Sequence, residues 1–167
     1  MKDYMTLPEY VIAPELGISL DVAEKIRKYH AHPMNILRNK LGFPIIVSAK
    51  SGYRHEDYEK SKGRSGSTHE FRKISERQDP GFGAADYRVA DQNFFKFITN
   101  LVQEDIYTRL IFYPESRTPF VHCDYRYFGI DKYYYLMSSS GIKRVSKNEI
   151  IESVWNRFLQ KKGEVYA

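Results

Sequence analysis

The sequence predicts an α+β fold in which a small, mostly antiparallel sheet is flanked by helices. Three segments carry apolar residues at helical spacing, namely residues 19–41, 91–103 and 147–161. Short apolar runs of strand length lie between them, at residues 43–47, 84–89, 108–113, 120–124 and 133–137. Helices and short strands in this irregular order are typical of α+β domains. The length of 167 residues suits one domain, so we expect a single unit over residues 1–167.

The predicted helices have recognisable ends. Ser19 or Asp21 can cap the first helix, Pro33 interrupts it, and Gly42 ends it. The second helix gathers Phe and aliphatic side chains on one face, which indicates that this face is buried. Ser146 precedes the third helix, and we expect this helix to form a C-terminal extension over about residues 146–162.

The predicted strands are separated by two kinds of connection. The runs 108–113 and 120–124 are close enough to pair through a turn around residues 114–117. Residues 48–82, in contrast, are polar, rich in Gly, Ser, Lys and Arg, and show little periodicity. A long loop is therefore expected there, and loops of this length in compact domains are usually functional or mobile.

Charge and composition exclude several classes of protein. The formal charge of +5 favours anionic partners through steering, but no basic run stands out, so we expect no specific nucleic-acid partner. The single cysteine, Cys123, excludes an intramolecular disulfide framework and a Cys-based zinc finger. Residues 1–10 lack the apolar segment of a secretory signal, and no apolar run approaches the roughly 18 residues that span a membrane. We therefore expect a chain made in the cytoplasm, which something else must deliver if it acts outside a cell.

Two of the five histidines, together with one aspartate, are candidate metal ligands. His69 lies at the rim of the polar loop, and Asp86 follows three small residues that let the backbone approach a neighbour closely. His122 alternates with Val121 and Cys123 along a strand and so faces the opposite side. Two imidazoles and one carboxylate form a common catalytic zinc set. Spacing alone leaves structural roles open, as a loop histidine, a turn carboxylate and a half-buried strand histidine.

Three segments in order carry a resemblance to a known family. They are the hydrophobic run that ends in Ser-Gly-Tyr-Arg (45–54), the Ser-Thr-His and Gly-Ala-Ala-Asp stretches (67–69 and 83–86), and Phe-Val-His-Cys-Asp (120–124). Together they resemble the zinc D-alanyl-D-alanine carboxypeptidases and related peptidoglycan peptidases, which include phage lysins. The signalling domain of hedgehog proteins shares this zinc fold, and residues 115–123 look like its corresponding strand. The resemblance covers about residues 33–126.

The resemblance implies a set of site residues. It makes His69, Asp86 and His122 the ligands of Zn²⁺, and it makes Arg54 the residue that contacts substrate or stabilises an oxyanion. Ser51 and Tyr53 belong to the same motif, where they either contact substrate or, as we favour, shape the loop.

The chain departs from the family in two places. His69 and Asp86 are 17 positions apart rather than seven, so an insertion within residues 70–81 must loop out, and it is the predicted place for a specificity lid. Pro119 stands where many members have an acidic general base. We expect Glu115 to take that role, with Asp124 as the alternative base. Asp124 has two further possible roles, orienting His122 or replacing a ligand.

These observations lead to two expectations for function. The first is zinc-dependent hydrolysis of a peptide bond in bacterial peptidoglycan, by a carboxypeptidase or an endopeptidase, in a protein that can be phage-encoded. Its partner is a wall peptide, and its positive charge suits a wall of anionic polymers. The second is a catalytically inactive, zinc-stabilised binding or virion structural module of the same fold. The place of action is the bacterial cell wall in the first case and the virion in the second.

Overall fold

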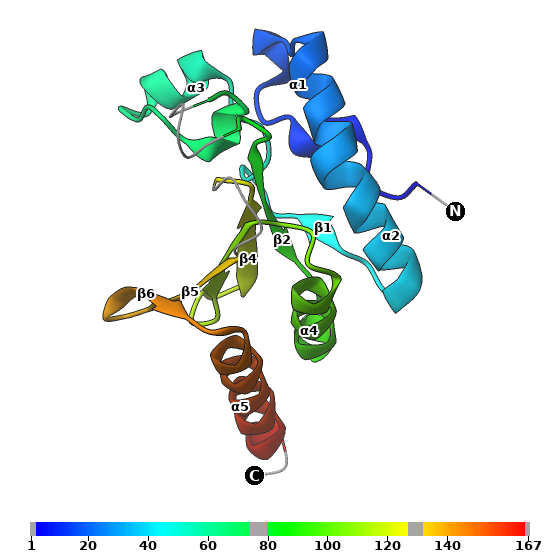
Figure 1. Ribbon diagram of the computed structural model, residues 1–167, viewed down its shortest axis with the longest axis vertical. Helices are drawn as coiled ribbons and strands as arrows, with labels where there is room; N and C mark the ends of the chain where they lie inside the picture. Colours follow the sequence, from blue (N-terminus) through cyan, green and yellow to red (C-terminus); the bar gives the residue numbers. More distant parts are fainter. Residues whose placement is uncertain (1–2, 74–79, 127–131, 166–167) are drawn as a thin grey trace.

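The computed structural model describes residues 3–73, 80–126 and 132–165, and it has an α+β fold built on one six-stranded sheet (Figure 1). The strands are β1 (Ile46–Val47), β2 (Ala84–Arg88), β3 (Arg109–Tyr113), β4 (Phe120–Asp124), β5 (Tyr133–Ser138) and β6 (Gly141–Val145). Their order in the sheet is β1-β2-β4-β3-β5-β6. All neighbouring strands are antiparallel except β3 and β5, which are parallel. The predicted fold class, with a mostly antiparallel sheet, is therefore confirmed.

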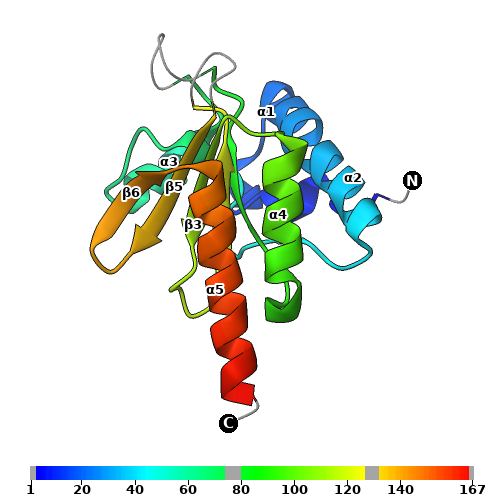
Figure 2. The ribbon, with the colours of Figure 1, turned by 60° about the horizontal axis from the view of Figure 1, so that its bottom comes forward.

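The longer helices gather on one side of the sheet. The α-helices are α1 (Leu20–Lys25), α2 (His32–Leu41), α3 (Glu56–Ser61), α4 (Phe94–Glu104) and α5 (Lys147–Val165). Figure 2 shows α4 and α5 side by side, with the end of α5 reaching beyond the sheet. Buried side chains from these helices, such as Met34, Phe97 and Ile150, join the core-facing residues of the strands in one hydrophobic cluster. The opposite face of the central strands stays free to carry polar side chains.

Three elements differ from the expectation. The helix α3 lies inside the segment 48–82 that was predicted to be loop, and β6 was not predicted. The first strand is also shorter than expected, since only Ile46–Val47 pairs with β2. Both additions are polar or exposed, so no buried apolar pattern marks them in the sequence. None of the described helices is long and apolar enough to cross a membrane.

The first predicted helix is continuous through Pro33 because it changes its winding. Ser19 is the N-cap, since its Oγ accepts a hydrogen bond from the Val22 N–H at 3.2 Å. Between α1 and α2 the chain forms a π-helical segment, Ile26–Ala31. A proline has no N–H and its ring crowds the carbonyl four residues earlier, here that of Tyr29. The Tyr29 carbonyl instead accepts a hydrogen bond from the Tyr125 hydroxyl at 2.8 Å.

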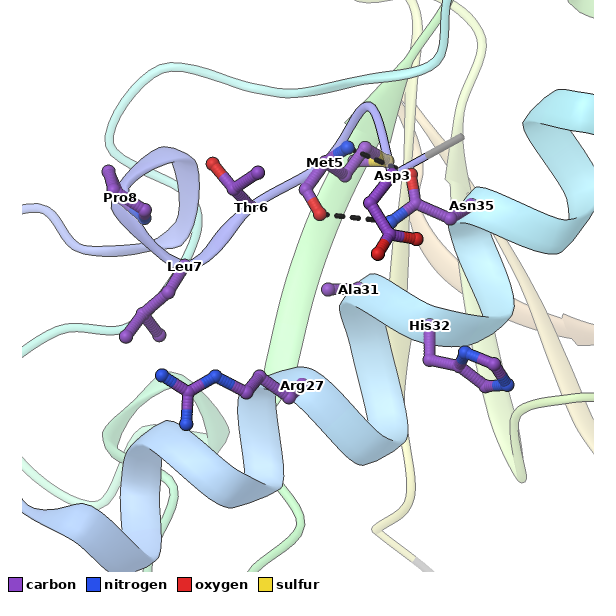
Figure 3. A pocket seen from close by; sticks show the side chains of 9 residues that line it. All are labelled: Asp3, Met5, Thr6, Leu7, Pro8, Arg27, Ala31, His32 and Asn35. Atoms are coloured by element: carbon purple, nitrogen blue, oxygen red, sulfur yellow. Dashed lines mark hydrogen bonds between the residues drawn. The ribbon is translucent and has the colours of Figure 1, made fainter. Parts of the chain in front are cut away.

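The N-terminal segment is tied to α2 by one side chain. Asn35 accepts hydrogen bonds from the backbone N–H groups of Tyr4 and Met5 through Oδ1, and its Nδ2 donates to the Met5 carbonyl at 2.9 Å (Figure 3). Further along, the Tyr10 carbonyl accepts a hydrogen bond from the Tyr53 N–H at 2.5 Å. The N-terminal segment therefore supports the loop that carries the Ser-Gly-Tyr-Arg motif.

The π-helical segment places His30 in the core, where the ring is uncharged. Its Nε2 lies 3.2 Å from the Phe82 carbonyl and so donates to it, which leaves Nδ1 to accept from the Tyr87 hydroxyl at 3.2 Å. Burial penalises the charged imidazolium and lowers the pKa of His30 to about 4. In the unfolded chain the same group would titrate near pH 6.5.

This difference predicts a loss of stability in mild acid. Above pH 6.5 His30 is neutral in both states, whereas between pH 6.5 and 4 only the unfolded chain binds the proton, so the free energy of unfolding falls by about 3 kcal/mol. Urea unfolding at pH 7 and pH 4 should show an acid loss in the natural chain that is about 3 kcal/mol larger than in His30→Gln, which keeps the loss due to the other buried groups such as His69. The exposed His32→Gln serves as the control and should behave like the natural chain. An equal acid loss in His30→Gln would contradict the assignment.

Candidate metal centre

Three buried side chains from distant parts of the chain converge on one point. His69 comes from a short 3-10 turn (Thr68–Glu70), Asp86 from β2 and His122 from β4. Asp86 and His122 are direct partners in the β2–β4 ladder. One ligand atom from each of the three residues lies within 4.8 Å of the others, and all three residues are at most 8% exposed. The three side chains are therefore close enough to bind one metal ion.

Strand alternation explains how the site and the core share the same strands. Val121 and Cys123 are fully buried in the hydrophobic cluster, as expected for the core-facing side of β4. His122 lies between them and faces the other side, as the sequence predicted. Ala84 and Ala85 precede Asp86 on β2, and both are fully buried.

The Ser-Gly-Tyr-Arg motif braces two of the three ligands through its backbone. The Gly52 carbonyl accepts a hydrogen bond from His69 Nδ1 at 2.9 Å, and the Arg54 N–H donates to the His69 carbonyl at 2.9 Å. The Ser51 carbonyl accepts from the Asp86 N–H, also at 2.9 Å. Because Nδ1 of His69 carries the proton, its Nε2 is free to bind a metal, and it lies 3.6 Å from Asp86 Oδ1.

A second carboxylate orients His122. Nδ1 of His122 lies 2.7 Å from Asp86 Oδ1, and its Nε2 lies 2.8 Å from Asp124 Oδ2. Asp124 is fully buried, and both of its oxygens also accept hydrogen bonds from Arg109, at 3.0 and 2.9 Å from Nε. The Arg126 N–H donates to the same carboxylate at 3.0 Å. Metal-binding histidines commonly have such a carboxylate partner.

Burial and neighbouring charges set the protonation of the site. Burial lowers the pKa of His69 to about 3, so its ring is neutral. Burial also opposes a charge on His122, but the hydrogen bonds to Asp124 and Asp86 outweigh it and raise the pKa of His122 to about 9. Burial would raise the pKa values of Asp86 and Asp124, yet the hydrogen bond from His122 helps hold both below their ordinary value. Both carboxylates are therefore ionised at neutral pH.

The ligands form part of the lining of an open hollow of about 370 Å³. The other lining residues are Arg54, Gly66, Ser67, Thr68, Arg109, Ile111, Tyr113, Phe120 and Arg126. Among the described residues that line the hollow, Asp86 carries the only carboxylate, whereas three residues are arginines. The carboxylates of Glu59 and Asp124 balance part of the positive charge of Arg54 and Arg109, and the charge that remains suits an anionic ligand.

Of the three residues predicted to contact substrate, only Arg54 lines the hollow. Arg54 donates from its Nε to the Lys50 carbonyl at 3.1 Å. Its Nη1 lies 3.7 Å from the buried carboxylate of Glu59. Tyr53 and Ser51 are not among the lining residues, and Tyr53 is buried in the hydrophobic cluster. Ser51 instead contacts Asp86 through its backbone carbonyl, which accepts a hydrogen bond from the Asp86 N–H.

Neither predicted general base is among the residues that line the hollow. Glu115 is exposed, its carboxylate accepts a hydrogen bond from the Ser139 N–H at 2.9 Å, and it lines a different hollow together with Glu149. The connection after β3 therefore places this carboxylate away from the three ligands. Asp124 is occupied by Arg109, His122 and a backbone N–H, so its position fits the orienting role that the sequence left open.

The predicted insertion within residues 70–81 is described only at its ends. Phe71 and Gly83 pack so closely that a Cβ at Gly83 would lie 2.3 Å from the Phe71 ring. Residues 74–79, where the specificity lid was predicted, lie outside the described residues.

The sequence analysis did not identify the residues of β3 that line the hollow. Arg109, Ile111 and Tyr113 alternate along β3 and stand opposite Asp124, His122 and Phe120. This alternation was available as a signal, since residues two apart on a strand share a face.

Comparisons with known proteins add no further assignment. No protein-family model matches the chain, and neither a curated protein nor a solved structure matches it. The site therefore has to be interpreted from its own geometry and from the three motifs.

Proposed function

We propose that this chain is a zinc-dependent hydrolase that cuts a peptide bond in bacterial peptidoglycan. The observation that carries the proposal is the convergence of His69, Asp86 and His122 at an open hollow. A structural metal site is usually closed by protein ligands, whereas a catalytic one keeps a position open. Three protein ligands beside an open hollow fit the second kind.

Zinc is the metal that this donor set fits best. Two imidazole nitrogens and one carboxylate oxygen match a common catalytic zinc site, whereas Mg²⁺ and Ca²⁺ are usually held by oxygen ligands. The tautomer of His69 supports the same assignment, because Nδ1–H donates a hydrogen bond to the Gly52 carbonyl and leaves Nε2 free to bind a metal. When bound, zinc would polarise a carbonyl group and lower the pKa of a coordinated water to about 7.

The chain's own residues position the reacting groups. The Gly52 carbonyl and the Asp124 carboxylate fix the two imidazole rings from outside the site. Arg54 presents its guanidinium to the hollow, where it would bind a substrate carboxylate or a developing negative charge. This geometry would hold a peptide carbonyl between the ligands and the arginines.

Peptidoglycan peptides are the substrates that the motifs indicate. Residues 45–54, 67–86 and 120–124 resemble the peptidoglycan peptidases, and the arginines that line the hollow suit the carboxylates of wall peptides. Carboxypeptidase and endopeptidase action both fit this hollow. The proposed places of action are the bacterial cell wall and the virion that delivers the protein to it.

One observation favours a second candidate, a zinc-stabilised binding or virion module without turnover. The described lining of the hollow contains no carboxylate apart from the ligand Asp86, so the usual general base is missing from it. Such a module would bind wall peptides and zinc and would release no product.

Metal content and hydrolysis test both candidates. The purified chain should contain a single zinc ion, and His122→Ala should lose it because the site then keeps only two ligands. Metal analysis after dialysis measures the zinc content, and release of amino groups from purified wall measures hydrolysis. His32→Ala is the matched control, since this histidine is exposed and lies on α2.

The outcomes separate the candidates. Zinc together with wall hydrolysis, both lost in His122→Ala and both kept in His32→Ala, would support the hydrolase. Zinc without hydrolysis would favour the binding module. A chain that takes up no zinc at neutral pH, even when zinc is added, would contradict both.

A further inference from the structure

A hydrolase of this kind needs a hydrogen-bond donor for the oxygen that gains charge. Neither carboxylate that was predicted to act as general base is available for this role. Glu115 accepts a hydrogen bond from Ser139 away from the hollow, and Asp124 is hydrogen-bonded to His122. We propose that the phenol of Tyr113 is a catalytic residue of this site, donating a hydrogen bond to the substrate's carbonyl oxygen as negative charge develops there. The inference rests on the proposed function and adds a residue to its mechanism.

The register of the sheet places Tyr113 next to the ligand His122, on the same face of the sheet. Ile111 on β3 is the direct partner of His122 on β4, and Tyr113 follows Ile111 by two residues on the same face. Its own partner is Phe120, so His122 is its diagonal neighbour, a spacing of about 7–8 Å that a long aromatic side chain can bridge. The side chain lines the same hollow as the three ligands.

The Tyr113 ring is held in place by packing. It stacks on Phe120 with the ring centroids 4.3 Å apart and the planes 11° from parallel. Within the described part of the chain, no hydrogen bond involves the Tyr113 hydroxyl, which leaves it available to a ligand. A donor that is fixed before substrate binds needs no reorganisation during the reaction, which is the main requirement for stabilising developing charge.

Burial keeps the Tyr113 phenol protonated. Burial raises the pKa of Tyr113, the Asp86 carboxylate raises it further, and the Arg109 guanidinium opposes the rise. The hydroxyl therefore acts as a donor at neutral pH rather than as a base. This complements the arginines in the hollow, which would bind a charge that the substrate already carries.

Tyr113→Phe isolates the hydroxyl, because the ring and its stacking on Phe120 are kept. In the full zinc-loaded chain, we expect kcat for a peptide ending in D-Ala-D-Ala, or for purified wall, to fall about 100-fold, the size expected for one such donor. The KM, the zinc content and the thermal stability should stay unchanged. Binding of inorganic phosphate to the zinc-loaded chain, measured by calorimetry, should weaken about tenfold, because a tetrahedral anion can use the same donor.

Tyr134→Phe is the matched control. Tyr134 pairs with Leu110, a core residue, so it lies on the opposite face of the sheet from the hollow. This variant should keep both kcat and phosphate affinity. The phosphate measurement needs no turnover, so it tests Tyr113 even if the natural chain proves inactive and the proposed function fails. Equal phosphate affinity and equal kcat in Tyr113→Phe and the natural chain would overturn the inference and leave Tyr113 as a packing residue.

Discussion

Replacing Gly52 by alanine is expected to abolish tight zinc binding and to lower the free energy of unfolding by about 3 kcal/mol or more. A Cβ at this position would lie 2.2 Å from the Tyr10 carbonyl oxygen and 2.7 Å from its carbon. Both atoms belong to the backbone, so no flexible side chain can move aside. On the other side of the contact, Tyr53 is hydrogen-bonded to Tyr10 and Ile12, which fixes the two segments together.

The loss of zinc follows from the same displacement. The Gly52 carbonyl holds His69 Nδ1 at 2.9 Å, and the neighbouring Ser51 carbonyl holds the backbone of Asp86. If the segment moves to admit a methyl group, both ligands lose their support. Loss of such an outer hydrogen bond alone typically costs about 10–100-fold in metal affinity. Competition with a chromophoric chelator measures the affinity, and urea unfolding measures the stability.

Gly163→Ala is the matched control for Gly52→Ala. A Cβ at Gly163 meets no atom within 4 Å, and this glycine lies in α5, where alanine is the better helix former. The control should keep its zinc and gain a few tenths of a kcal/mol to about 1 kcal/mol in stability. Tight zinc binding by Gly52→Ala would show that the motif does not brace the ligands.

Local patterns predicted features of single ligands but not the convergence of the three. Alternation along residues 120–124 predicted that His122 faces away from Val121 and Cys123, and the small residues before Asp86 predicted a close approach of two chain segments. What joined these signals was the family resemblance, because periodicity does not give the β2–β4 register that makes Asp86 and His122 partners.

The position of Glu115 could not be predicted, because it depends on how the connection between β3 and β4 folds. Glu115 lies in the connection between β3 and β4, and the direction of that connection decides which surface its carboxylate reaches. In the structure the Glu115 carboxylate is hydrogen-bonded to the Ser139 N–H, beside β6. The residues of β6 are mostly exposed, so no apolar pattern in the sequence predicted this strand. The ion pair between Asp124 and Arg109 could not be predicted either, because it depends on the β3–β4 register that makes these two residues direct partners.

Replacing Asp124 by asparagine is the second change with a large expected effect. The substitution keeps the shape of the side chain but removes the charge that lies between Arg109 and His122. The Arg109 side chain is 11% exposed and would keep its own charge without a carboxylate to balance it. Breaking a buried pair by removing one charge typically costs about 3–5 kcal/mol, and we expect a loss of this size in the free energy of unfolding.

The same substitution separates the two roles considered for Asp124. If the carboxylate orients His122, Asp124→Asn should weaken zinc binding about 10–100-fold, and catalysis should recover in part when zinc is raised. If it were the general base, zinc affinity would stay unchanged while kcat fell at every zinc concentration. Asp21→Asn is the control, because that carboxylate is 70% exposed and its ion pair with Lys25 contributes little.

A double variant shows whether the stability loss comes from the stranded charge on Arg109. Combining Asp124→Asn with Arg109→Gln removes both charges, so the double variant should unfold with a loss smaller than the sum of the two single losses. Urea unfolding of the natural chain, the two single variants and the double variant provides this cycle. Strict additivity would mean that the pair contributes nothing as a pair. Asp124 would then stabilise the fold mainly through its hydrogen bond to His122.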